Sequence, residues 1–223
     1  AGLTILEGYG LTETLPVICV NSERDFRIGT VGKPVAGVEV RIAPDGEILT
    51  RGPHVMKGYF NKPDATRETI DDEGWLHTGD IGALEDGFLR ITDRKKDIIV
   101  TAGGKNIAPQ PIENRLKLNR LVAEAVVIGD KRPYPVVLIV PNRENLAAWA
   151  AQNGVTGGDD LATLVADAKV QTLYRTEIEG ALHGLANYEV PKKIGLLSRE
   201  FSIDGGELTP KLSVKRRVVE KRY

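Results

Sequence analysis

The sequence predicts an α+β fold in two parts: a β-rich part over residues 1–93 and a separate, small α+β domain over residues 94–223. Glycines and short β-like runs fill the first part, whereas the second combines apolar β-branched runs with longer helical stretches. The character changes at the charged run 93–97, and a length of 223 residues is enough for one large or two small domains.

The first part is predicted to be mostly antiparallel sheet. Its short apolar and alternating runs predict strands at residues 15–20, 38–42 and 47–51. Asp45-Gly46 and Asp86-Gly87 lie between such runs, and Asp-Gly accepts the positive φ of a tight turn. Both pairs therefore predict hairpins.

The second part is predicted to mix strands with helices. Apolar runs predict strands at residues 97–101, 123–128, 136–140 and 194–197. Helical spacing predicts helices over residues 112–121, 142–152, 159–184 and 214–222. Pro111 opens the first of these helices, which is expected to point Ile112, Leu116 and also Leu118 inward.

Composition and charge limit the partners and the compartment. The 30 basic and 31 acidic residues give a net charge of −1, so bulk charge indicates neither nucleic acid nor an anionic membrane as a partner. The single cysteine, Cys19, cannot form an internal disulfide, which fits a reducing compartment and a cytoplasmic location. No apolar run approaches the roughly 20 residues of a transmembrane segment, although peripheral membrane contact stays open. The chain opens without Met or a signal peptide, so a fragment of a longer chain is expected.

The segment Gly8-Tyr9-Gly10-Leu11-Thr12-Glu13-Thr14 is the first candidate site. Glycines on both sides of an aromatic residue let the backbone approach a flat ligand, and Tyr9 offers a ring that stacks on a base. Thr12 offers a hydroxyl to a phosphate, and Glu13 offers an oxygen to Mg²⁺. The alternative interpretation is a Gly-rich turn with a surface glutamate.

The segment Gly74-Trp75-Leu76-His77-Thr78-Gly79-Asp80 is the second candidate. An Asp that follows a Gly can accept two hydroxyls of a ribose, as acidic residues do in other nucleotide sites. The alternative is that Asp80 caps a turn. His77 is interpreted as structural, because no acidic or Cys partner lies at metal-ligand spacing from it.

Two further candidates lie at and after the predicted boundary. In Asp93-Arg94-Lys95-Lys96-Asp97, Arg94 offers a two-pronged guanidinium to ribose or phosphate, and the position favours a hinge over a plain solvated face. In the segment 101–109, Gly103 and Gly104 form a loop that can pass close to a ligand but lacks the P-loop pattern. A plain turn is the alternative there.

In this order the four segments resemble the second half of the adenylate-forming superfamily, which comprises acyl-CoA synthetases, peptide-synthetase adenylation domains and luciferases. Arg51-Gly52-Pro53 with Gly58-Tyr59-Phe60-Asn61-Lys62-Pro63 matches a further family block, so the resemblance covers essentially the whole chain. Within the superfamily, the Gly104-Lys105-Asn106-Ile107-Ala108-Pro109 and Glu207-Leu208-Thr209-Pro210 segments and the extra helical stretch 142–187 resemble the long-chain fatty acid–CoA ligase branch. The first part would then be the C-terminal portion of the large adenylation domain, and the second the mobile C-terminal domain.

The resemblance implies a two-step reaction of a fatty acid with ATP, Mg²⁺ and coenzyme A. The carboxylate attacks the α-phosphate to give acyl-AMP and pyrophosphate, and the thiol of coenzyme A then displaces AMP to give the thioester. Motif positions imply the following roles: Gly8, Tyr9 and Gly10 at adenine, Thr12 at the α-phosphate, Glu13 at the metal, Asp80 and Arg94 at the ribose, Lys96 at the hinge, and Gly103, Gly104, Lys105 and Asn106 at the tunnel for coenzyme A.

Two departures from the family pattern matter. The upstream phosphate loop and most of the acyl pocket are absent, so these residues are expected to need the N-terminal part of their own chain, and acyl chain length is not readable. Ser213 also stands where long-chain members carry a catalytic lysine. Lys211 is favoured as its replacement, because residues i and i+2 of an extended segment share a face; Lys215 is the other candidate.

The favoured function is therefore part of an AMP-forming fatty acyl-CoA synthetase that is inactive alone. Two alternatives stay open. Ser213 and the missing phosphate loop are compatible with a non-catalytic nucleotide-binding module. The same motifs also fit an adenylation domain that loads a carrier protein instead of coenzyme A.

Overall fold

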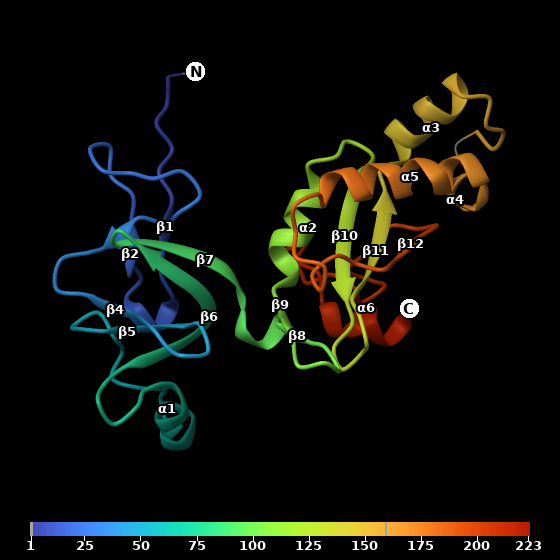
Figure 1. Cartoon of the computed structure of the whole chain (residues 1–223). Helices are drawn as coiled ribbons and strands as arrows, with labels where there is room; N and C mark the ends of the chain where they lie inside the picture. The colour runs from blue at the N-terminus through green and yellow to red at the C-terminus, as the bar shows by residue number, and fades with distance from the viewer. Residues whose placement is uncertain (1, 159) are drawn as a thin grey trace. The chain divides into compact units, whose positions relative to one another are not determined.

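The computed structural model describes residues 2–158 and 160–223, in two compact units, Ala1–Lys96 and Asp97–Tyr223 (Figure 1). Residue 1, which the predicted first part includes, and residue 159, where a helix is predicted to begin, lie outside the described residues. Each unit combines helices with antiparallel strands, so the predicted α+β fold is confirmed.

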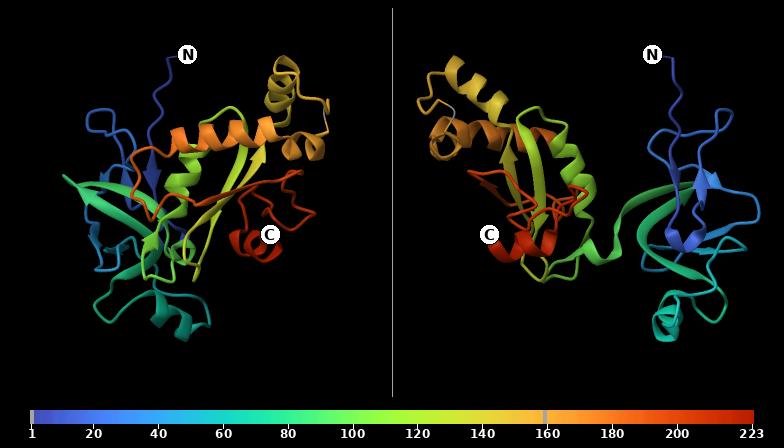
Figure 2. Two further views of the ribbon diagram at one scale, coloured as in Figure 1. Left: turned by 45° about the vertical axis from the view of Figure 1, so that its right-hand side comes forward. Right: turned by 180° about the vertical axis from the view of Figure 1, so that it is seen from behind.

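The first unit is built on a four-stranded antiparallel sheet in the order β4-β5-β6-β7. Its strands are β4 (Glu39–Ile42), β5 (Glu47–Arg51), β6 (Leu76–Glu85) and β7 (Phe88–Arg94). The last two form a long, bent hairpin (Figure 2). A small sheet of β1 (Gly8–Tyr9), β2 (Cys19–Val20) and β3 (Lys33–Pro34) accompanies it. Ile18, Cys19, Ile48 and Leu89 form a fully buried core in this unit.

Both predicted hairpin turns are confirmed. Gly46 has a φ of 87° between β4 and β5, and Asp86 and Gly87 have φ values of 52° and 81° between β6 and β7. At Asp86-Gly87, positive φ at both central residues gives a turn whose twist matches that of the flanking strands. The second turn returns the chain so that β7 runs beside β6, with Arg94 opposite Asp80.

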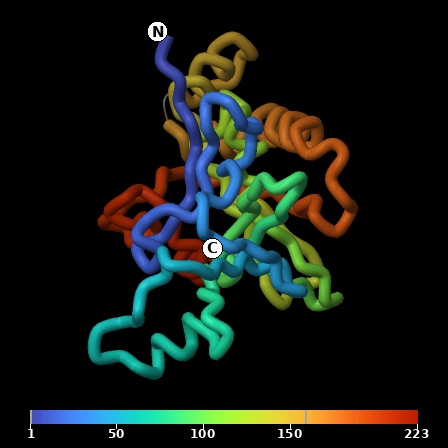
Figure 3. Tube along the Cα trace, turned by 90° about the vertical axis from the view of Figure 1, so that its left-hand side faces the viewer, coloured from blue at the N-terminus to red at the C-terminus, as the bar shows by residue number. Residues whose placement is uncertain are grey.

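Three parts of the first unit differ from the predictions. The predicted strand 15–20 is reduced to β2, because Leu15 has a left-handed φ of 47° and precedes Pro16. The strand β6 was not predicted, since glycines interrupt its alternation of apolar and polar residues. Nor was α1 (Pro63–Thr69), a short helix with Pro at its first position. The segment that carries α1 extends away from the sheet (Figure 3).

The second unit is a sheet in the order β10-β11-β12 with an apolar core on each face. Its strands are β10 (Val122–Ile128) and β11 (Val136–Pro141), which are antiparallel, and β12 (Lys193–Leu196), which runs parallel to β11. Val127 and Ile139 point into one core, whereas Val126 and Leu138 point into the other. This alternation follows from the two-residue period of a strand.

Helices cover both faces of that sheet (Figure 1). The larger core contains side chains of α2 (Pro109–Lys117), α3 (Arg143–Gln152), α4 (Leu161–Ala166) and α5 (Ala168–Ala181). The smaller core contains Val219 of α6 (Arg216–Arg222). Two short strands, β8 (Ile99–Val100) and β9 (Asn106–Ile107), pair at the start of the unit.

Several predicted boundaries in this unit need correction. The helix predicted from residue 159 to 184 is two helices, because Asp167 adopts an extended ψ of 135° and caps α5 with its side chain. The helix α2 begins at Pro109 and ends at Lys117, which leaves Leu118 86% exposed rather than inward. The strand predicted over residues 97–101 is reduced to β8. The last helix begins at Arg216, because Val214 pairs with Leu208 in a β-bridge.

Glu207 is a fully buried carboxylate that holds the end of the chain together. Its side chain forms ion pairs with Arg199 and with Arg222 of α6, and its carbonyl accepts the amide of Lys215 at 2.7 Å. Burial alone raises the pKa of this carboxyl, but the bonds from the two arginines and the Ser202 amide outweigh it and lower the pKa to about 2. The ionised form therefore belongs to the folded state.

Replacement of Glu207 by Gln is expected to remove stability in a pH-dependent way. A folded pKa below the ordinary value of 4.5 means that the ionised carboxyl stabilises the fold above pH 4.5 and loses this contribution as the pH falls toward 2. Urea unfolding of both proteins between pH 7 and pH 3 measures the difference. A difference in unfolding free energy that stays constant over this range would contradict the assignment.

Candidate nucleotide site

The carboxylate of Asp80 joins three of the predicted site residues within the first unit. The hydroxyl of Tyr9 donates to its Oδ2 at 2.5 Å, and Nε of Arg94 lies 2.8 Å from its Oδ1. Tyr9 comes from β1, Asp80 from β6 and Arg94 from β7. A carboxylate offers about four lone-pair positions, so after these two bonds about two acceptor positions are left for hydroxyl groups.

Tyr9 is held as a hydrogen-bond donor. Burial, together with the hydrogen bond to the Asp80 carboxylate, raises the pKa of its hydroxyl well above the usual range, because an ionised phenolate would face a negative charge in a dry environment. The hydroxyl is therefore protonated at neutral pH and fixes the direction of the ring. A fixed ring is suited to stacking on a flat base.

A β-bulge aims Asp80 at its partners. Between two register positions, β6 spans residues 77–81 where β5 spans only residues 47–49. Gly79 takes a left-handed φ of 71° in the bulge, a conformation that side chains disfavour. Thr78 closes the bulge: its hydroxyl donates to the carbonyl of Ile48 at 2.7 Å and accepts the amide of Asp80 at 3.1 Å.

Gly10 permits a close backbone crossing in the first motif. A Cβ atom on this residue would lie 1.5 Å from the carbonyl oxygen of Pro16, so only Gly fits there. Gly8 lies in β1 opposite Val20. The motif thus needs glycine for packing around Tyr9, whereas the sequence alone attributed its glycines to the approach of a ligand.

Thr12 and Glu13 follow on a short 3₁₀ turn, η1 (Thr12–Thr14). Thr12 is exposed, and Glu13 accepts a hydrogen bond from the hydroxyl of Tyr59 at 2.8 Å. This bond raises the pKa of Tyr59 and orients the carboxylate. Sequence reasoning placed Tyr59 in a family block but missed it as the partner of Glu13. Mg²⁺ is usually held by one or two carboxylates together with substrate phosphates, so Glu13 fits the metal role that the resemblance implies.

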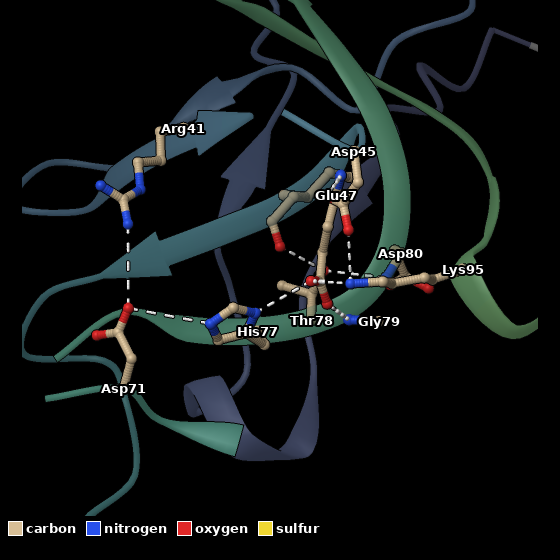
Figure 4. A network of polar contacts seen from close by, with 10 residues as sticks. Arg41, Asp45, Glu47, Asp71, His77, Thr78, Gly79, Asp80 and Lys95 are labelled. Carbon is tan, nitrogen blue, oxygen red and sulfur yellow. Dashed lines mark hydrogen bonds and ion pairs between the residues drawn. The ribbon is translucent and has the colours of Figure 1, made fainter. Parts of the chain in front are cut away.

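Beside Asp80 lies a network of charged side chains that sequence reasoning missed (Figure 4). Glu47 is 3% exposed; its Oε1 accepts the amide of Gly79 at 3.0 Å, and its Oε2 lies 3.0 Å from Nδ1 of His77 and 2.8 Å from Nζ of Lys95. Burial raises the pKa of Glu47, but the bonds from Lys95, His77 and Gly79 outweigh it and lower the pKa overall. Lys95 also contacts Asp45 at 2.7 Å.

His77 does have acidic partners, which corrects the argument from spacing. Besides Glu47, Oδ2 of Asp71 lies 3.9 Å from its Nε2. Both partners are distant in sequence or lie before the motif, so local spacing did not reveal them. No group of three or more His, Cys, Asp or Glu side chains suited to a metal was found among the described residues. The structural role of His77 stays a prediction.

The predicted residues of the second unit lie in an exposed turn between β8 and β9. Gly104 has a φ of 74°, and its amide donates to the carbonyl of Thr101 at 2.9 Å. The hydroxyl of Thr101 donates to the carbonyl of Lys105 at 3.3 Å and accepts the amide of Lys105 at 3.1 Å. The ammonium of Lys105 lies 5.7 Å from the centre of the Tyr188 ring. Gly103, Gly104, Lys105 and Asn106 are all exposed. Lys96, the predicted hinge residue, is exposed in the 3₁₀ turn η2 (Lys95–Asp97).

The segment around Ser213 is a turn, so the reason for choosing Lys211 was wrong. Leu212 takes a left-handed φ of 61°, and its amide donates to the carbonyl of Thr209 at 2.8 Å. In such a turn Lys211 and Ser213 do not share a face as they would in a strand. Lys211 and Lys215 are both exposed, and both stay candidates for the missing cation.

Comparison with known proteins agrees with the motifs. Residues 1–60 match the model of the AMP-binding enzyme family, and residues 96–172 match that of the AMP-binding enzyme C-terminal domain. The chain is 45% identical to the long-chain-fatty-acid–CoA ligase FadD15 of Mycobacterium bovis, over 100% of this chain and 37% of that protein. It is 38% identical to long-chain-fatty-acid–CoA ligase 6 of Homo sapiens, over 96% of this chain and 33% of that protein. The chain thus spans well under half the length of these relatives.

Solved structures of similar fold agree with the match to AMP-binding enzymes. O-succinylbenzoate coenzyme A synthetase (MenE) from Bacillus subtilis, in complex with ATP and magnesium ion, is 29% identical with a TM-score of 0.68 and covers 97% of this chain and 41% of its own. The ATP-bound RpMatB-BxBclM chimera B1 is 26% identical with a TM-score of 0.72, over 100% of this chain and 42% of its own. The resemblance drawn from the motifs is confirmed, and the chain belongs to the AMP-binding enzyme superfamily.

Proposed function

We propose that this chain is the nucleotide-holding and C-terminal part of an AMP-forming long-chain fatty acid–CoA ligase. The observation that supports it best is the meeting of Tyr9, Asp80 and Arg94 at one carboxylate, with acceptor positions left for a ribose. The identity with long-chain-fatty-acid–CoA ligases over the whole chain supports the fatty acyl class.

In this proposal each side chain acts on a defined part of the substrates. Asp80 accepts the ribose hydroxyls while Tyr9 and Arg94 hold its carboxylate in place. Thr12 donates its hydroxyl to the α-phosphate, and Glu13 holds Mg²⁺, which neutralises charge that develops on the phosphates. Lys211 or Lys215 supplies the cation that Ser213 lacks, and the turn 103–106 contacts coenzyme A. Lys96 is the hinge residue at which the C-terminal domain rotates between the two half-reactions.

A second function, a non-catalytic nucleotide-binding module, is favoured by one observation. Ser213 carries no charge, and removal of one preorganised donor to an oxyanion typically costs about 2.7–4 kcal/mol of transition-state stabilisation. Such a protein would bind ATP or AMP without forming acyl-AMP. The cytoplasmic location stays a prediction. Within the described residues, none of the helices is both long and apolar enough to cross a bilayer.

The test is an assay of the intact protein that carries this sequence. ATP, Mg²⁺, coenzyme A and a panel of fatty acids are supplied, and release of AMP is measured. Release of AMP that depends on an added fatty acid supports the ligase. Tight binding of ATP without AMP release in the presence of any fatty acid supports the second function. Pyrophosphate exchange with Lys211→Ala and Lys215→Ala then separates the two lysines, because only the one that replaces the family lysine is expected to slow adenylation.

A further inference from the structure

We propose that Glu47 is a positioning residue for the nucleotide: its buried carboxylate fixes the bulge that aims Asp80 and ties this bulge to Lys95, next to Arg94. The inference rests on the proposed function, because it gives Glu47 its role through the two residues proposed to hold the ribose. Glu47 itself lies in β5 and acts through Gly79 and Lys95, not by contact with a substrate.

The first step is the bond from Glu47 to the bulge. The amide of Gly79 has no ladder partner on β5, since β6 bulges away from that strand here. Oε1 of Glu47 accepts this amide at 3.0 Å, immediately before Asp80 in the chain. This bond is part-buried, and a donor that loses its acceptor away from water is costly. Loss of the Glu47 carboxylate would therefore let the bulge adopt another conformation and move the Asp80 carboxylate.

The second step is the bond from Glu47 to Lys95, the residue after the end of β7. Its other oxygen, Oε2, lies 2.8 Å from Nζ of Lys95, and Lys95 follows Arg94 at the end of β7. The same ammonium lies 2.7 Å from Asp45, whose side chain also accepts the amide of Glu47 at 3.2 Å. One carboxylate thus contacts the Gly79 amide, immediately before Asp80, and the Lys95 side chain, immediately after Arg94 (Figure 4).

Stability alone is a poor reason for this arrangement. Buried carboxylates that pair with a half-exposed cation, as Glu47 does with the 47% exposed Lys95, add little stability, because desolvation of the buried charge offsets its attraction to a partner that water screens. Their best-attested use is to fix one geometry among several. Here the geometry that is fixed belongs to Asp80, 3% exposed and already bonded to Tyr9 and Arg94.

The experiment compares four variants of the intact protein. Glu47→Ala removes both contacts, and Glu47→Gln keeps an amide oxygen for Gly79 but loses the charge opposite Lys95. Lys95→Met removes the cation alone. Arg90→Met is the matched control, because Arg90 pairs with Glu85 at 3.7 Å on the exposed, far end of the same hairpin. The readouts are the Kd for AMP, the separate values of KM for ATP and kcat, and amide hydrogen exchange over residues 77–82.

The expected order of effects is specific to positioning. Glu47→Ala raises the Kd for AMP about tenfold or more, the factor that corresponds to loss of one charge-assisted hydrogen bond. It also speeds amide exchange over the bulge and raises KM for ATP more than it lowers kcat. Glu47→Gln retains most AMP affinity, Lys95→Met lies between these two variants, and Arg90→Met matches the wild type.

Several results would overturn the inference. One is a folded Glu47→Ala protein with unchanged AMP affinity and unchanged exchange over residues 77–82. If Glu47→Ala does not fold, an unchanged Kd in Lys95→Met has the same force. Failure of the proposed function is distinguishable: the wild type then either binds no AMP or releases no AMP from ATP with any fatty acid. The hydrogen exchange of Gly79 and Asp80 in Glu47→Gln and Lys95→Met still supports or refutes the positioning.

Discussion

Replacement of Asp80 by Ala is expected to weaken binding of AMP to the intact protein at least a hundredfold. A hydrogen bond to a charged group contributes roughly 1.5–3 kcal/mol, and the proposed site uses two such bonds to the ribose hydroxyls. Their loss, about 3–6 kcal/mol, corresponds to a factor of roughly 10² to 10⁴ in Kd. Calorimetric titration with AMP measures the change, and 2′,3′-dideoxy-AMP is expected to bind the wild type and the variant alike.

Two milder variants show whether the charge or the shape of this site matters. Asp80→Asn keeps the volume and one acceptor oxygen but removes the charge beside Arg94, so an intermediate loss is expected. Tyr9→Phe keeps the ring and both carboxylate oxygens and removes only the hydroxyl that orients the carboxylate at 2.5 Å, so a smaller loss of AMP affinity than in Asp80→Ala is expected. If Asp80→Ala melts like the wild type and still binds AMP with the same affinity, the ribose assignment is wrong.

The pairing of Asp80 with Arg94 shows which part of the site could be predicted from the sequence and which part could not. The Asp86-Gly87 turn, which was predicted, places Glu85 opposite Phe88, and regular pairing from there would put Asp80 opposite Asp93. A shift between Ile81 and Gly82 moves the register by one residue and brings Arg94 opposite Asp80 instead. Such a shift decides which side chains meet, and local residue preferences do not contain it.

Contacts between residues far apart in the chain could not be predicted from the sequence for a similar reason. Glu47 and Gly79 are 32 residues apart and meet because β5 and β6 are neighbours, although β6 itself was not predicted. In contrast, β10 and β11 were predicted almost to the residue, since continuous β-branched runs are typical of strands buried on both faces. The sequence thus predicted the elements with a uniform period, but not the contacts that orient the candidate site residues.

Replacement of Glu113 by Ala is expected to reduce the free energy of unfolding by about 3–5 kcal/mol, the usual cost of removing one partner from a buried ion pair. Glu113 lies on α2 and forms a two-pronged pair with Arg216 of α6, with NH1–Oε1 and NH2–Oε2 distances of 2.5 and 2.9 Å. The two side chains are 9% and 16% exposed. Oε1 also accepts the amide of Val127 at 2.7 Å, so the pair joins both helices to β10.

Urea unfolding of the variant measures this loss, and Glu124→Ala is its matched control. Glu124 pairs with Lys117 at 3.0 Å in the same unit, but the two side chains are 25% and 37% exposed. Water screens that pair, so its removal is expected to cost at most about 1 kcal/mol. Equal losses for Glu113→Ala and Glu124→Ala would contradict the view that burial makes the Glu113 pair important.

The double variant Glu113→Leu with Arg216→Met distinguishes the charge from the packing. If most of the cost of Glu113→Ala comes from a guanidinium left in the protein interior without its carboxylate, removal of both charges is expected to restore part of the stability, as in other buried pairs. The recovery is expected to be incomplete, because the amide of Val127 then lacks its acceptor. Arg216 is also the first residue of α6 and follows the segment that carries Lys211 and Lys215. A stable double variant that adenylates slowly would therefore indicate that the pair holds this segment in place for the reaction.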